Sequence, residues 1–161
     1  MANDQWPVDY VRTAVVLAHP VAAVLVVWLF FRQRGWRGQS TLLRGEERVA
    51  AVSAHESMGD RIAIISIGIV ALAFASNMAR GVIDHGDATR FLVPGFHGIT
   101  GIMGLSLMLY LWKLGRDTTA KKASGEPFSG TKERHGRISD LLGVLIIIHS
   151  FLGFLYMLSI L

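Results

Sequence analysis

Residues 62–79 read IAIISIGIVALAFASNMA, a stretch without a charged side chain. Three further stretches that are nearly free of charge lie at about 11–31, 91–112 and 138–161, and the charged residues collect between them. Each is close to the roughly 20 apolar residues that cross a bilayer as a helix. The sequence therefore predicts an all-α integral membrane four-helix bundle with spans at about 11–31, 55–79, 91–112 and 136–161. The second helix is expected to begin near Ser53, before its apolar stretch, because Ser53 with Glu56 fits a capping box.

The composition agrees with a membrane protein. Of the 161 residues, 52% are hydrophobic and only 17% are charged, whereas soluble domains carry about 25% charged residues. This excludes an ordinary soluble enzyme and a disordered chain, and it predicts one four-span domain over residues 1–161. The sequence has no cysteine, which excludes disulfides, iron–sulfur clusters, zinc thiolate sites and covalently attached c-type haem.

The basic residues predict an orientation in the membrane. Most of the 16 Lys and Arg residues lie in the first and third loops, and the N-terminal tail and second loop hold only Arg12, Arg80 and Arg90. By the positive-inside rule, loops one and three are cytoplasmic and both termini lie on the non-cytoplasmic side. Acidic residues such as Glu46 and Glu133 interrupt the basic loops, so no nucleic-acid partner is expected.

Histidines near the starts of the helices are the candidate functional residues, because ionisable groups at membrane depth are functional by default. In the predicted orientation His19 and His97 share a depth on the non-cytoplasmic side, and His55 and His135 share a depth on the cytoplasmic side. A b-type haem, held without covalent attachment, needs two imidazoles at one depth on facing helices. The sequence thus predicts two metal sites, His19 with His97 and His55 with His135.

Small residues near these histidines would leave room for a macrocycle, because residues three, four and seven positions apart share a helix face. The candidate cofactor-binding positions of this kind are Gly98, Gly101, Gly104, Gly59 and Ser139. Small residues also mediate close helix packing in membranes without any cofactor, which is the alternative interpretation.

Other roles are open for some histidines. Any one of them could simply hydrogen-bond to a neighbouring helix. His149 lies about 21 Å beyond His135 along the same helix, at 1.5 Å per residue, and on nearly the same face, so it is a reserve ligand. His85 is expected to be a loop residue.

The ordered set of these motifs resembles the four-helix core of the cytochrome b561 family. It is most similar to that family's short relatives of unknown function in photosynthetic organisms. The motifs are Leu17-Ala-His-Pro20, Gly35-Trp36, His55 with Gly59, Pro94-Gly-Phe-His97 and Arg134-His135. The resemblance covers residues 15–161, and the chain lacks the two outer helices of the full-length family.

The resemblance implies a transmembrane electron carrier with two haem b groups, one near each membrane face, and the same two histidine pairs. Its partners would be membrane lipid and an electron donor and acceptor, either proteins or quinone. Arg134, Arg137 and Arg61 are expected to lie near the inner pair and to favour a haem propionate. The alternative is a structural or assembly subunit of a larger photosynthetic or respiratory complex, in contact with other membrane subunits. Such a subunit could bind haem, or (bacterio)chlorophyll through a histidine.

Overall fold

The computed structural model describes residues 6–161, and nearly all of them are helical. The long helices are α1 (Trp6–Arg34), α3 (Gly45–His85), α4 (Phe96–Ser124) and α5 (Ser129–Ile160), and α2 (Trp36–Gln39) is a short turn after α1. The four long helices are each long and apolar enough to cross a membrane. The structure therefore confirms the all-α architecture expected from the sequence, with four helices that are able to span a membrane.

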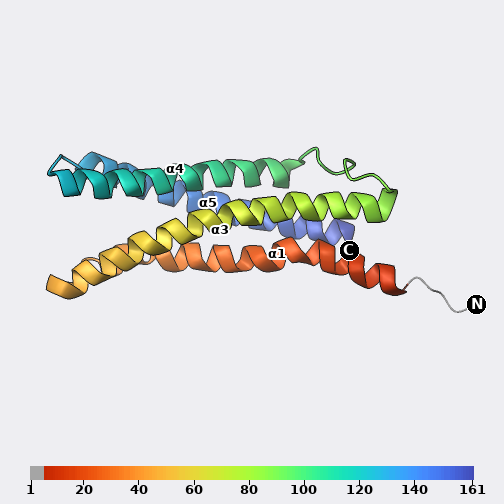
Figure 1. The fold of residues 1–161 in the computed structure, drawn as a ribbon, viewed down its shortest axis with the longest axis horizontal. Coiled ribbons are helices and arrows are strands. Elements are labelled where there is room, and N and C mark those ends of the chain that lie inside the picture. Colours follow the sequence, from red (N-terminus) through yellow and green to blue (C-terminus); the bar gives the residue numbers. More distant parts are fainter. Residues whose placement is uncertain (1–5) are drawn as a thin grey trace, which may run out of the picture.

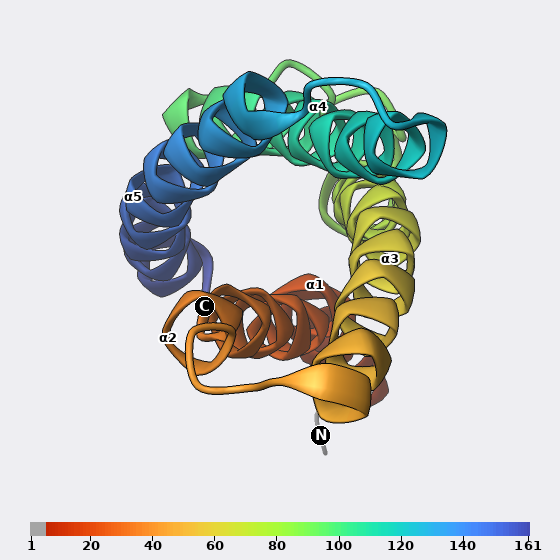
Figure 2. The same ribbon diagram turned by 90° about the vertical axis from the view of Figure 1, so that its left-hand side faces the viewer.

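The four long helices surround a common axis (Figure 2). Helix α1 packs against α3, α3 against α4 and α4 against α5, and α1 and α5 close the ring with a smaller contact, whereas α1 with α4 and α3 with α5 touch little or not at all. Helices α1 and α4 therefore lie diagonally across the bundle, as do α3 and α5. The start of α1, the connection from α3 to α4 and the end of α5 all lie at one end of the bundle (Figure 1).

The helices extend further than the apolar stretches predict. Helix α3 begins at Gly45 and not near Ser53, and Glu46 and Glu47 occupy its first turn, where carboxylates favour the positive end of the helix dipole. Helix α4 begins later than residue 91 and continues to Ser124. The third loop thus shrinks to 125–128, with Gly125 at φ 75° closing α4. Charged helical turns outside the apolar stretches explain the added length, whereas α4 starts late because Pro94 and Gly95 precede it.

The connection from α3 to α4 is held by local hydrogen bonds. Gly86 ends α3 at φ 68°, and the amide of Asp87 donates to the carbonyl of Gly81 at 3.2 Å. The hydroxyl and amide of Thr89 both donate to the Asp87 carboxylate and lower the pKa of that exposed group. The loop is therefore a compact turn that covers one end of the bundle.

Buried apolar side chains form one cluster inside the bundle. They come from all four long helices and comprise Phe30, Ile62, Met108, Leu111 and Leu142. Many other large apolar side chains point outward, as expected of helices that face lipid. This cluster joins the four long helices to one another.

Replacing Leu142 should destabilise this centre. Leu142 is only 1% exposed, so Leu142→Ala should lower the free energy of unfolding by about 2–4 kcal/mol through lost contacts and a cavity. The neighbouring Leu141, 53% exposed, is the matched control. Unfolding in mixed detergent micelles checks the difference; equal losses for the two variants would contradict this description of the core.

Candidate functional site

The structure brings His19 and His97 together across the bundle. His19 lies in α1 and His97 is the second residue of α4, so the two come from diagonal helices. Their ring centroids lie 6.1 Å apart with 66° between the ring planes. Both residues line a cavity of about 810 Å³ in the half of the bundle that ends at the loop from α3 to α4.

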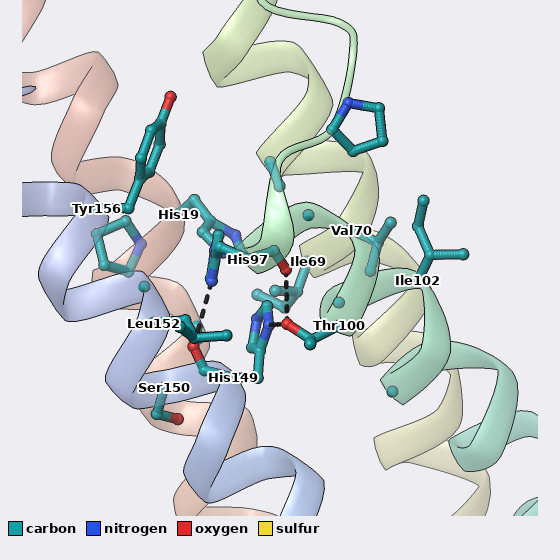
Figure 3. A pocket seen from close by; sticks show the side chains of 18 of the residues that line it. His19, Ile69, Val70, His97, Thr100, Ile102, His149, Ser150, Leu152 and Tyr156 are labelled. Atoms are coloured by element: carbon teal, nitrogen blue, oxygen red, sulfur yellow. Dashed lines mark hydrogen bonds between the residues drawn. The ribbon is translucent and has the colours of Figure 1, made fainter.

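A third histidine joins this pair. The ring of His149, from α5, stacks on that of His97 with centroids 4.1 Å apart and 14° between the planes. One nitrogen from each of His19, His97 and His149 lies within 4.8 Å of the others, and Figure 3 shows the three rings converging. We call this cluster site 1. The reserve ligand predicted on α5 therefore lies at the same site as the first predicted pair.

Hydrogen bonds fix the orientation of two of the three rings. Nδ1 of His97 lies 3.2 Å from the carbonyl oxygen of His149, to which it donates in the neutral tautomer that leaves Nε2 free. Nδ1 of His149 lies 3.1 Å from the Thr100 hydroxyl, which itself donates to the carbonyl of His97 at 2.9 Å (Figure 3). Such backbone and hydroxyl partners orient histidine ligands in metal sites.

His19 is placed differently. Its Nδ1 is buried and has no hydrogen bond of normal geometry to any described residue, although the backbone of Ile69 in α3 lies near the ring. A buried polar atom without a partner costs free energy. The orphaned nitrogen therefore favours a site that is completed by something the chain itself does not supply.

Glycines make room for the rings of site 1. A Cβ on Gly153 would lie 2.7 Å from Cε1 of His97, and one on Gly101 would lie 3.0 Å from Cε1 of His149. Gly98 and Gly104 also line the cavity. A Cβ on Gly98 would instead meet Pro94 at 2.7 Å, and one on Gly104 would meet nothing within 4 Å. The sequence identified Gly101 but not Gly153.

The second predicted pair is also brought together. His55 in α3 and His135 in α5 have ring centroids 6.5 Å apart and 71° between their planes. We call this pair site 2. Nδ1 of His135 lies 3.1 Å from the carbonyl oxygen of Leu111 in α4, while Nδ1 of His55 is buried and has no hydrogen-bond partner among the described residues.

Site 2 is more tightly packed than site 1. The ring of Trp36 stacks on His55 at 5.4 Å, and the Gln33 amide donates to the carbonyl of His55 at 2.5 Å. The cavity there measures only about 70 Å³, and Gly59 and Ser139 are among its lining residues. A Cβ on Gly115 would lie 3.3 Å from Cε1 of His135.

The arginines predicted near the inner pair point elsewhere. Arg137 forms an exposed ion pair with Glu133 at 2.5 Å, and Arg134 is exposed. Neither lines the cavity at site 2. The arginine that does line it is Arg34, which pairs with Asp140 at 2.7 Å. His85 is exposed and packs on Phe91 at 5.4 Å, outside both sites.

Both pairs have the spacing of two imidazoles on one metal ion. With metal–nitrogen bonds of about 2.0–2.1 Å, opposed rings have centroids about 6.3 Å apart. The observed 6.1 and 6.5 Å lie on either side of this value. The cavity of about 810 Å³ at site 1 lies within the range of about 300–1,000 Å³ typical of cofactor pockets. The cavity at site 1 is thus of cofactor size, whereas the cavity of about 70 Å³ at site 2 is too small for a macrocycle unless the surrounding side chains move apart.

No protein-family model, curated protein or solved structure matches the chain.

A methyl group on Gly153 should disturb site 1. Gly153→Ala places Cβ against His97, so we expect a loss of about 1–3 kcal/mol in unfolding free energy from overpacking and a displaced His97 ring. Gly104→Ala, with open space around it, is the control and should be nearly neutral. Unfolding and the NMR signals of labelled histidine rings check both, and an undisturbed His97 signal in Gly153→Ala would contradict the packing described.

Proposed function

We propose that the chain is a b-type cytochrome that carries electrons across a membrane, with one haem held by His19 and His97 and a second held by His55 and His135. The observation that supports this most is that two diagonal histidine pairs, each with the spacing of a shared metal ion, lie in opposite halves of one bundle. In each pair one ring is oriented by a backbone carbonyl and the other has a buried Nδ1 without a normal hydrogen bond.

The distance between the two sites suits transfer across a bilayer. His135 and His149 are separated by about 21 Å along α5, at 1.5 Å per residue. Between them lies Leu142, seven residues from each along the chain and only 1% exposed, which would help to keep water out of the space between the sites. Because the hydrocarbon core is about 30 Å thick, each site would lie near one membrane face.

The donor set determines the kind of chemistry. Haem bound by two imidazoles undergoes one-electron reduction and oxidation at iron without an open coordination position for oxygen or substrate. The chain's own contribution is to hold the imidazoles, to fix their tautomers through Leu111 and His149, and to set the surrounding polarity. The electron donor and acceptor, proteins or quinone, would approach from the two membrane faces.

The orientation and location are part of the proposal. The basic loops favour a cytoplasmic site 2 and a non-cytoplasmic site 1, with both termini on the side of site 1. The membrane would be an inner, plasma or photosynthetic membrane.

A second candidate is a structural or assembly subunit of a larger photosynthetic or respiratory complex. The small cavity of site 2, about 70 Å³, favours this alternative, because a chain evolved for two haems would be expected to have two roomy cavities. In that case site 1 would hold one haem, or a (bacterio)chlorophyll whose magnesium is bound by a histidine, and the outward apolar side chains would contact other subunits.

Loss of one histidine per site separates these candidates. His97→Ala and His55→Ala should each remove one of two haems and leave the other, because no histidine is shared between the two pairs. His85→Ala is the control and should retain both. The measurement is the dithionite-reduced minus oxidised spectrum together with haem content per chain. A wild-type chain with a single haem, or with a chlorin absorbing in the red, would favour the subunit instead.

The orientation can be tested because the chain has no cysteine. Val93→Cys, at a position 88% exposed in the loop from α3 to α4, should react with an impermeant maleimide added outside intact cells. Ser124→Cys, exposed at the end of α4, should react only after lysis. Labelling of Ser124→Cys but not Val93→Cys in intact cells would show the opposite orientation in the membrane and contradict this prediction.

A further inference from the structure

Arg80, near the end of α3, is an arginine buried without a counterion. Its side chain lines the cavity of site 1, and the residue is only 4% exposed. A guanidinium remains charged in proteins and carries five N–H donors, and burying such a charge is costly unless it is paired. The position of Arg80 in α3 does not by itself explain why this charged side chain is buried.

The neighbours of Arg80 pair with only some of its N–H donors. One terminal nitrogen donates to the hydroxyl of Tyr156 at 2.7 Å. The guanidinium also lies over the ring of Phe91, 3.8 Å from its centroid. Nε is buried without a hydrogen-bond partner, and among the described residues no carboxylate forms an ion pair with Arg80.

Arg12, at the same end of the bundle, shows the contrast. Its guanidinium donates to both oxygens of Asp84, at 2.8 and 3.3 Å, and to the carbonyl of Ile160 at 2.9 Å. The chain thus supplies a carboxylate to the more exposed arginine and leaves the more deeply buried one without such a partner.

Arg80 is connected to site 1 through one side chain. The ring of Tyr156, whose hydroxyl accepts from Arg80, lies parallel to the ring of His97, with centroids 6.2 Å apart and 18° between the planes. A ligand held at His97 and extending toward the end of the bundle would therefore meet the guanidinium inside the same cavity.

We propose that Arg80 binds a carboxylate of the molecule that occupies the cavity of site 1. This deepens the proposed function and rests on it, since for haem b the carboxylate is a propionate. A carboxylate would accept from the unpaired donors of Arg80 and neutralise its charge, and guanidinium–carboxylate pairs are short and directional. A lipid phosphate is the less suitable partner, because Arg80 lies in the cavity and is almost completely shielded from the bundle's surface.

The test compares two porphyrins, one with free propionates and one whose propionates are neutralised as methyl esters. The full chain, prepared without haem in a nonionic, phosphate-free detergent, is titrated with iron protoporphyrin IX and with its dimethyl ester. Absorbance reports binding in the His55→Ala background, which restricts it to site 1. Wild-type Arg80 should favour the free acid by about 10- to 100-fold, the value of one hydrogen-bonded charge pair.

The variants identify the residue responsible. Arg80→Gln should abolish the preference and Arg80→Lys should retain part of it, while the matched control Arg12→Gln should keep it fully. The ratio of the two affinities is internal to each variant, so a general loss of stability does not imitate the effect. An unchanged ratio in Arg80→Gln would overturn the inference while leaving haem binding intact. Failure of both porphyrins to bind the parent chain would overturn the proposed function itself, and this inference with it.

Discussion

An imidazole inside an apolar bundle must have partners for both nitrogens, and this requirement underlies the rest of the structure. In each half of the molecule one histidine satisfies Nδ1 with a carbonyl of a neighbouring helix, as His97 does with His149 and His135 does with Leu111. The diagonal partner leaves Nδ1 buried and without a normal hydrogen bond. Each half of the bundle therefore holds one half-satisfied histidine pair at a spacing that suits a shared metal ion.

The packing of the helices follows from the space these rings need. Gly153, Gly101 and Gly115 stand where a methyl group would press on a histidine ring of the neighbouring helix, so α4 and α5 can approach closely around the imidazoles. Large apolar residues such as Leu142 fill the middle of the bundle instead. The alternation of small residues at the sites and large residues between them separates the two halves.

The sequence was sufficient to predict the four spans and the residues that meet, because hydropathy gives the crossings and alternating crossings give the depth of each histidine. It did not predict the helix ends, since charged turns such as that of Glu46 continue a helix beyond the apolar stretch. It also missed the roles of Thr100, Tyr156 and Arg80, and it placed Arg137 near a site that it does not line. These depend on helix rotation and on contacts between distant residues, which a pattern along one chain does not determine.

In the proposed cytochrome, two imidazoles share one haem iron in each half of the bundle, and their planes are far from parallel, at 66° and 71°. Electron paramagnetic resonance of the oxidised, haem-loaded chain is the decisive measurement. Two low-spin ferric signals of the kind given by strongly rotated imidazole pairs are expected. High-spin ferric iron, or a single low-spin centre at full haem loading, would contradict it.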